Sequence, residues 1–226
     1  MIPVEEKEEG FERFAGGKML AAWEIASVTS SFLIAEWMIQ PFAGKSQLIS
    51  AIPIALAFAL MLLSHRARGE SARDVGWRLD NFIKAIRLLI LPLLVLGGLT
   101  IITGWLNRGF RSDKLQMWQW VVWLPVWGLM QQYVLQGFIN RRAQIIWGRG
   151  LRSILLVALL FALLHMPNLW LSAATFLGGL VWAAVYQRAP NLPALALSHG
   201  LMSLLLASSL PASTLNSLRV GIRYFG

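Results

Sequence analysis

The sequence contains no cysteine and is poor in charged side chains. Without cysteine, the chain has no disulfide bond, no thiolate nucleophile and no cysteine metal ligand. Charged residues make up 14% of the 226 residues, whereas soluble domains carry about 25%. The shortage of charge accompanies a hydrophobic content of 57% and several long apolar runs. These features predict a polytopic membrane protein and argue against a soluble domain.

Carboxylates are missing from the second half of the chain, because no aspartate or glutamate follows Asp113. Histidine is therefore the only side chain in the later apolar segments that titrates near neutral pH. A glutamine amide orients a water molecule but does not accept its proton. A carboxylate base for these segments would have to come from Glu24 or Glu36, which lie in the first apolar segment.

Seven apolar segments are predicted to cross a membrane, since a crossing needs about 20 residues. They cover residues 19–39, 47–64, 82–106, 117–139, 151–166, 168–187 and 191–210. The predicted fold class is all-α, a polytopic transmembrane helix bundle with about seven spans. We expect a cytoplasmic N-terminal tail, a single transmembrane helical domain and a C-terminal tail, over residues 1–18, 19–210 and 211–226 respectively.

The net charge of +9 comes from lysines and arginines that lie between the apolar segments. Such residues are typical of loops that flank membrane helices, so we predict no nucleic-acid partner. Most of them fall in inner loops if the N-terminus is cytoplasmic, which is the orientation that the positive-inside rule favours. With seven spans, the C-terminus then lies outside.

Polar side chains at membrane depth are costly enough that each needs a reason. A cluster of amides lies at the end of the fourth apolar segment and directly after it: Gln131, Gln132, Gln136 and Asn140. Gln132, Gln136 and Asn140 recur every four residues and share one helix face. Hydrogen bonds between helices would explain this stripe. His165 and His199 lie in two later apolar segments, and a pair of intramembrane histidines near a polar stripe indicates a shared site.

A zinc site fits the same histidines less well. His165 and His199 would supply two ligands, and Glu24 or Glu36 a third. However, a structural or catalytic zinc site needs three or four protein ligands, and the chain has no His-Glu-x-x-His pair. We therefore predict neither a metal ion nor a cofactor.

Two further alternatives rest on single features of the sequence. Ser198 or Ser203 could act as a nucleophile beside a histidine, but no Gly-x-Ser-x-Gly turn accompanies either serine. A small transporter could use the glutamine and histidine face as a polar path. Only the polar residues at membrane depth support that alternative.

Three short motifs together resemble the CPBP family, the CAAX proteases and bacteriocin-processing enzymes that cut within the membrane. The family pattern is Glu-Glu-x-x-x-Arg on one helix, Phe-x-x-x-His on the next and His-x-x-x-Asn on a later one. Gln131-Gln132-Tyr-Val-Leu-Gln136, followed by Gly-Phe, stands where the first motif would be. The resemblance covers about residues 116–205, which form the motif-bearing core.

The second and third motifs keep their histidines. Phe161-Ala-Leu-Leu-His165 matches the second motif in full, and His199-Gly-Leu-Met-Ser203 departs from the third at its last position. In the family, the paired glutamates are thought to activate water, while the histidines and the asparagine support the transition state. Here each missing group is replaced by a neutral polar side chain.

The resemblance implies a site and a partner. The site positions are Gln131, Gln132, His165 and His199, with Gln136, Phe161 and Ser203 in supporting positions. The implied partner is a membrane-embedded or lipidated peptide segment, and the implied location is a bacterial inner membrane. Besides the small transporter, two functions remain open at this point: an intramembrane endopeptidase with a rearranged site, and a non-catalytic relative that binds its peptide as an adaptor.

Overall fold

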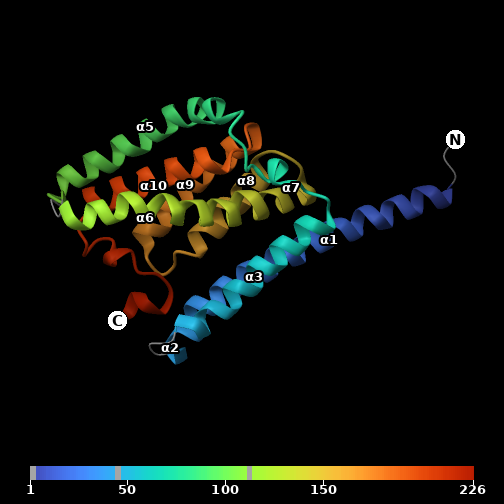
Figure 1. Ribbon diagram of the computed structural model, residues 1–226, viewed down its shortest axis with the longest axis horizontal. Helices are drawn as coiled ribbons and strands as arrows, with labels where there is room; N and C mark the ends of the chain where they lie inside the picture. Colours follow the sequence, from blue (N-terminus) through green and yellow to red (C-terminus); the bar gives the residue numbers. More distant parts are fainter. Residues whose placement is uncertain (1–3, 44–46, 111–113) are drawn as a thin grey trace.

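The regular elements of the protein are all helical (Figure 1). The structure is a computed structural model that describes residues 4–43, 47–110 and 114–226, and no strand occurs within these ranges. In chain order the elements are α1 (Val4–Leu33), η1 (Ile34–Ile39), α2 (Gln40–Ala43), α3 (Gln47–Ala67), α4 (Ala72–Val75), α5 (Phe82–Leu106), α6 (Lys114–Gln132), η2 (Tyr133–Asn140), α7 (Arg141–Trp147), α8 (Leu151–Leu163), α9 (Leu169–Arg188), α10 (Leu192–Ser209), η3 (Asn216–Leu218) and η4 (Gly221–Phe225). The predicted all-α class is confirmed.

Within the described residues, four helices are long and apolar enough to cross a membrane, judged by length and composition. They cover Gly17–Phe42, Phe82–Leu106, Leu169–Arg188 and Leu192–Ser209. Two shorter apolar helices, Ala51–Ala67 and Leu151–Leu163, coincide with two more of the predicted spans. The polytopic bundle is therefore confirmed, whereas the number of seven crossings stays a prediction.

The N-terminal part of the chain extends the first helix beyond the predicted crossing. Helix α1 begins at Val4, inside the segment assigned to an N-terminal tail, and projects away from the bundle in Figure 1. Residues 1–3 of that segment lie outside the described ranges. The cytoplasmic side of this segment remains a prediction.

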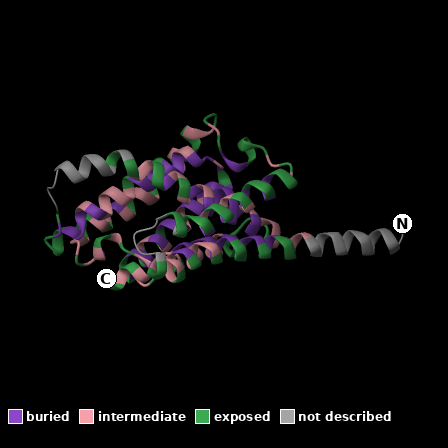
Figure 2. Ribbon diagram, turned by 60° about the horizontal axis from the view of Figure 1, so that its bottom comes forward, coloured by how far each residue is buried: buried purple, intermediate pink, exposed green. Residues whose placement is uncertain are grey.

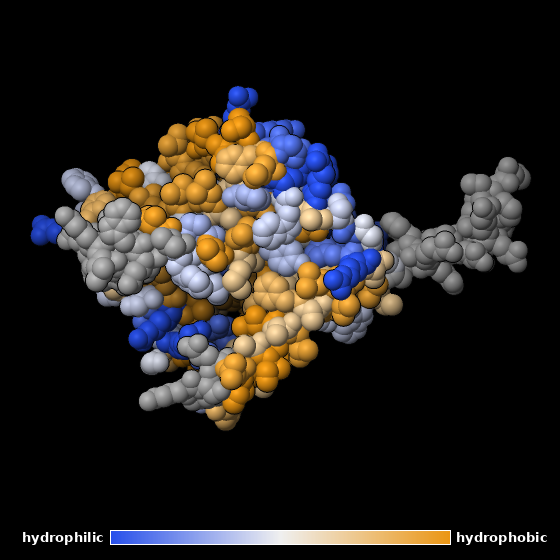
Figure 3. Space-filling model, viewed as in Figure 1, coloured by the Kyte–Doolittle hydropathy of each residue, from blue (hydrophilic) through white to orange (hydrophobic). Residues whose placement is uncertain are grey.

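The outer surface of the bundle is apolar. Helix α5 exposes Ile90, Leu91 and Leu94, and only 17% of its most apolar stretch is buried inside the protein. Figure 2 shows buried residues concentrated where the helices face one another. In Figure 3, apolar side chains cover broad helix surfaces and hydrophilic groups gather towards the ends of the bundle. A helix that is apolar on its exposed side fits a lipid environment better than water.

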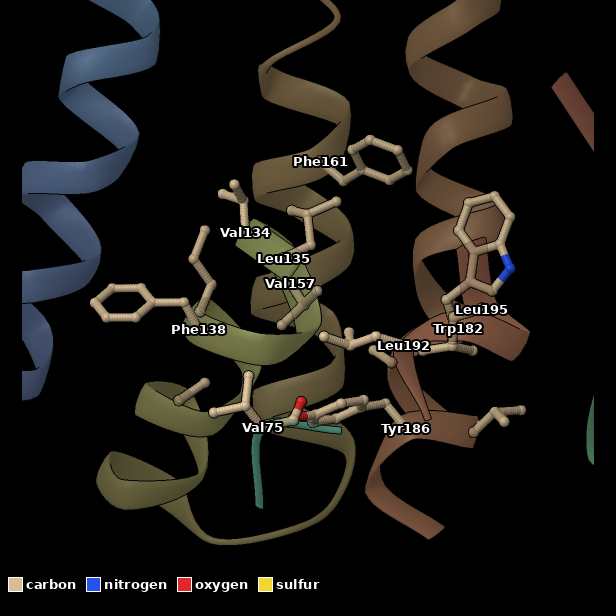
Figure 4. Close-up of a cluster of buried hydrophobic side chains, with 14 of the residues drawn as sticks. Val75, Val134, Leu135, Phe138, Val157, Phe161, Trp182, Tyr186, Leu192 and Leu195 are labelled. Carbon is tan, nitrogen blue, oxygen red and sulfur yellow. The ribbon is translucent and has the colours of Figure 1, made fainter. Parts of the chain in front are cut away.

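The buried core lies between η2, α8, α9 and α10. Val134, Leu135 and Phe138 of η2 pack there with Val157 of α8 and Leu192 of α10 (Figure 4). Phe161 of α8 and Trp182 of α9 belong to the same cluster and lie together in the view. This core fixes the relative positions of η2, α8 and α10, which carry residues of the predicted motifs.

Helices α6 and α10 approach each other closely at Gly200. A Cβ atom on Gly200 would lie 3.0 Å from the main-chain nitrogen of Pro125. A backbone atom cannot move aside as a flexible side chain does, so this contact requires glycine. Close helix approach through small residues is typical of packing between membrane helices.

We predict that Gly200→Ala destabilises the protein by about 1–3 kcal/mol, because the added methyl group overpacks the α6–α10 contact. Thermal unfolding in detergent measures the effect. Gly98→Ala is the matched control, since a Cβ atom on this α5 residue meets no atom within 4 Å. Equal melting temperatures for the two variants would contradict the prediction.

A buried ion network joins α1 and α3 to α7. Glu24 accepts a hydrogen bond from Ser64 Oγ at 2.6 Å and another from Arg68 Nη2 at 3.0 Å. Arg142 Nε lies 2.9 Å from the same carboxylate, and the Arg142 side chain is 0% exposed. In Figure 1, α1 and α3 lie side by side and diverge from the other helices, so this network ties their end to the motif-bearing part.

Glu70, in the loop after α3, is the second carboxylate of this network. It accepts hydrogen bonds from Arg142 Nη2 at 2.9 Å, from Arg141 Nε at 2.9 Å and from His65 Nδ1 at 2.6 Å. Burial alone would raise the pKa of Glu70, but these hydrogen bonds hold it well below its usual range. Glu70 is therefore ionised at neutral pH and acts as a fixed counter-ion for the two arginines.

Candidate functional site

The first motif lies where α6 changes into the π-helical element η2. Gln132 is the last residue of α6, and Gln136 and Asn140 belong to η2. Both glutamines are fully buried. Short π-helical segments inside α-helices occur frequently at functional sites, because they change the direction of the side chains that follow.

Gln132 and His199 form the centre of the site. Gln132 Nε2 lies 3.1 Å from His199 Nδ1, although 67 residues separate them in the sequence. Because the amide nitrogen only donates, His199 Nδ1 accepts this hydrogen bond and the ring proton is on Nε2. The other amide atom, Gln132 Oε1, is buried and has no hydrogen-bond partner among the described residues.

Trp182 of α9 fixes the His199 ring from one side. The two rings stack with centroids 4.5 Å apart and planes inclined by 26°. The indole nitrogen of Trp182 donates to Ser198 Oγ at 3.0 Å, and this hydroxyl in turn donates to the main-chain oxygen of Leu195. The Ser198 hydroxyl is therefore already committed to two partners.

His165 follows α8 and stands on the other side of Phe161. The Phe161 ring meets His165 edge-on at 4.8 Å and His199 edge-on at 5.6 Å. His165 Nδ1 donates to the main-chain oxygen of Phe161 at 2.8 Å, so its Nε2 carries the lone pair. The structure thus brings His165 and His199 together around Phe161, with Gln132 hydrogen-bonded to His199.

The two histidines have opposite hydrogen-bonding roles at Nε2. His165 presents an acceptor and His199 a donor, as the partners of their Nδ1 atoms require. His165 is half-buried and His199 is buried. A neutral pair of this kind can accept a proton from one group and donate a hydrogen bond to another.

Gln136 belongs to a different network from Gln132. Its Oε1 accepts from Asn140 Nδ2 at 2.8 Å, and Asn140 Oδ1 accepts from Gln187 Nε2 at 3.1 Å. Gln187 also donates to Ser153 Oγ at 2.9 Å, which links α9 to α8. Hydrogen bonding, the simpler explanation of the glutamine stripe, therefore accounts for Gln136 and Asn140, and Asn140 makes the bond to a neighbouring helix. Gln136 Nε2 is buried without a partner in the described part of the chain.

The remaining predicted positions lie at the edge of the site. Gln131 is half-buried, and Ser203 lies on α10 one helical turn after His199. Among the residues that the structure describes, neither Gln131 nor Ser203 hydrogen-bonds either histidine. Ser198 hydrogen-bonds Trp182 instead, so no serine–histidine pair is formed there.

Glu24 and Glu36 are held by arginines. Glu24 belongs to the buried network with Arg142, and Glu36 lies 3.4 Å from Arg223 Nη2. In the described part of the chain, neither carboxylate hydrogen-bonds His165 or His199, and no group of three or more histidine, aspartate or glutamate side chains is placed to hold a metal ion. The histidine site is thus formed by neutral groups.

Several residues around the site were not predicted from the sequence. Trp182 positions His199, and Arg142 and Glu70 anchor the helix that continues from the first motif. One of the eleven tryptophans in an apolar helix gives no signal of its own. The pair Arg141-Arg142, directly after the polar stripe, was the available signal for the ion network. The described residues also form an open pocket of about 450 Å³ at the end of α5, and no predicted site residue lines it.

The comparison with known proteins bears on the same part of the chain. The family model for type II CAAX prenyl endopeptidase Rce1-like proteins matches residues 113–205. All three predicted motifs lie within this range. Neither a curated protein nor a solved structure matches the chain.

The match extends from the beginning of α6 into α10, so it contains the Gln132–His199 contact, His165 and the helices that hold them. Together with the apolar helices, it identifies a membrane-integrated protein that resembles CAAX proteases. The resemblance inferred from the motifs is confirmed over residues 113–205, where the chain is similar to type II CAAX prenyl endopeptidase Rce1-like proteins.

Proposed function

We propose that the protein binds a membrane-embedded or lipidated peptide segment at Gln132, His165 and His199, and that it does not hydrolyse this peptide by a carboxylate-activated water. The protein would act as a binding partner or adaptor built on a protease fold. We further propose a bacterial inner membrane as its location, with the N-terminus in the cytoplasm, since the positive-inside rule favours that orientation.

The Gln132–His199 hydrogen bond carries the proposal. It places a neutral amide against the imidazole at a position where the family pattern has a glutamate. A glutamine orients a ligand or a water molecule, but it does not remove a proton at neutral pH. Losing a general base typically lowers a rate by about 10²- to 10⁴-fold.

The donor and acceptor groups of the site suit a peptide ligand. His165 Nε2 and Gln132 Oε1 offer acceptors, and His199 Nε2 offers a donor. A peptide bond presents one N–H and one carbonyl oxygen, both of which need partners away from water. Phe161 and Trp182 supply an apolar wall beside these groups.

Binding and turnover should be measured with the purified protein and a panel of membrane-helix and CAAX-type lipidated peptides. We expect at least one peptide to bind without cleavage, and His199→Ala to weaken that binding by about tenfold, or 1.4 kcal/mol. Leu201→Ala, at an exposed α10 residue outside the site, is the control.

Two results would contradict the proposed function. Turnover by the native protein that disappears in both His165→Ala and His199→Ala would show an active endopeptidase and refute the non-catalytic proposal. If the native protein and His199→Ala bind the peptide with the same affinity, the peptide does not bind at Gln132, His165 and His199.

A further inference from the structure

The segment 211–226 folds back onto the turn that carries His165. Element η4 of this segment packs against η1 and α2, which continue α1, and Figure 1 shows the end marked C beside α2. The segment therefore lies where the turn between α8 and α9 meets the first membrane helix. Its contacts there are mostly made by main-chain groups.

Asn168 holds the first half of the segment. Its side chain is 1% exposed, and Nδ2 donates to the main-chain oxygen of Leu215 at 2.7 Å and of Arg219 at 3.2 Å. The other side-chain atom, Oδ1, accepts from the main-chain nitrogen of Leu171 and caps α9. One buried amide thus binds two carbonyl groups of the segment while it fixes the start of a helix.

Gly221 holds the second half. Its main-chain nitrogen donates to the main-chain oxygen of Met166 at 2.9 Å, directly after His165. Its φ is +57°, and a Cβ atom would lie only 2.8 Å from the main-chain oxygen of Glu36. Both the left-handed backbone and the close contact require glycine at this position.

Side chains add selectivity to these main-chain contacts. Arg223 Nη2 lies 3.4 Å from both carboxylate oxygens of Glu36. The ring of Phe225 lies 6.5 Å from that of Trp37 on η1. The turn and η1 therefore contact a glycine, an arginine and an aromatic residue at intervals of two along the segment.

The backbone of the segment is strained, which shows how firmly these contacts hold it. Asn216, Ser217 and Leu218 have φ values of 44°, 53° and 62°. Three successive residues other than glycine in the left-handed region persist only where surrounding contacts impose the conformation. The contacts of Asn168 on either side of this stretch provide that constraint.

We propose that the turn Met166–Asn168, together with Glu36 and Trp37, is a peptide-binding surface and that segment 211–226 is its resident occupant. A second peptide with the pattern Gly-x-Arg-x-aromatic competes for the same surface. The proposal does not rest on the binding site at Gln132, His165 and His199, because in the described part of the chain no hydrogen bond or ring contact joins these three side chains to the segment.

The experiment uses the full chain in detergent and a fluorescent synthetic peptide with the sequence of residues 211–226. In Gly221→Val the resident segment cannot bind to the turn. We therefore expect this variant to bind the peptide at least about tenfold more tightly than the native chain does, because in the native chain the peptide competes with the tethered segment. Gly226→Val is the control, since a Cβ atom there meets nothing within 4 Å. Equal affinity for Gly221→Val and the native chain overturns the proposal.

Two further measurements guard against misfolding and against binding elsewhere. Arg223→Ala should bind the peptide roughly two- to fivefold more tightly than the native chain, as loss of one exposed ion pair predicts, whereas Arg219→Ala should not change the affinity. No difference between these two variants overturns the proposal. Adding His199→Ala to Gly221→Val should leave binding unchanged, and loss of binding would place the peptide at the Gln132–His199 site instead.

Discussion

Replacing Gln131 and Gln132 together by glutamate is expected to create or raise peptide hydrolysis by about 10²- to 10⁴-fold, the usual contribution of a general base. Gln132 already hydrogen-bonds His199 at 3.1 Å, so a carboxylate at this position lies within reach of the imidazole. Position 132 is fully buried beside His199, which is where a general base would have to stand in this site. Activity is measured as cleavage of the peptide panel, with product masses that identify the cut.

Gln136→Glu is the matched control for this gain. Gln136 is as deeply buried as Gln132 and lies one helical turn further along, but its side chain faces Asn140. A carboxylate there should not confer activity. Equal hydrolysis by Gln136→Glu and by the double variant would show that the position beside His199 has no special role. If the double variant folds but hydrolyses no peptide, the site lacks other catalytic groups besides the general base.

Arg142→Met is expected to lower the free energy of unfolding by about 3–5 kcal/mol. The substitution removes the cation that Glu24 and Glu70 share, so each buried carboxylate loses one positively charged partner. Arg142 is 0% exposed and lies 2.9 Å from Glu24 and 2.9 Å from Glu70. Methionine keeps most of the buried volume, so lost packing contributes little. Unfolding in detergent, followed by circular dichroism, measures the loss.

The exposed pair Arg73–Asp80 provides the control. The Arg73 side chain is 65% exposed and its partner 43% exposed, so Arg73→Met should change stability by at most about 1 kcal/mol. Adding Glu70→Gln to Arg142→Met should restore part of the loss, since one of the uncompensated charges is then removed. A loss in Arg142→Met no larger than in Arg73→Met would contradict a structural role for the network.

The pH dependence of stability follows from Glu70. Its pKa is lower in the folded protein than in the unfolded chain, where a glutamate titrates at about 4.3. Its contribution is therefore fully present above that pH and is lost as the pH falls towards the folded value. Glu70→Gln should remove this part of the acid destabilisation, and that comparison separates Glu70 from the other acidic residues.

Much of the candidate site could be predicted from the sequence because its residues recur at short, regular intervals. Phe161 and His165 are predicted to lie one helical turn apart on the same face, and in the structure their rings meet edge-on at 4.8 Å. The order of the motifs also indicated that His165 and His199 share a site. Such patterns depend on local helix geometry, which the sequence specifies directly.

The glutamine stripe shows where this local reasoning ends. A regular α-helix places Gln132, Gln136 and Asn140 on one face, but the structure separates their roles. Gln132 bonds His199, while Gln136 and Asn140 bond each other within the π-helical element η2. Which partner an amide finds depends on how the neighbouring helices pack, and this information is distributed over the whole chain.

By itself, the sequence determined the helical membrane class, the motif positions and the loss of the family's carboxylates, because apolar length, spacing and residue type are properties of the chain alone. Only the tertiary structure decided that Glu24 pairs with Arg142, that Trp182 stacks on His199 and that segment 211–226 lies on the turn after His165. These contacts join residues far apart in the sequence, and they form only when helix packing has removed competing partners and water from around each polar group.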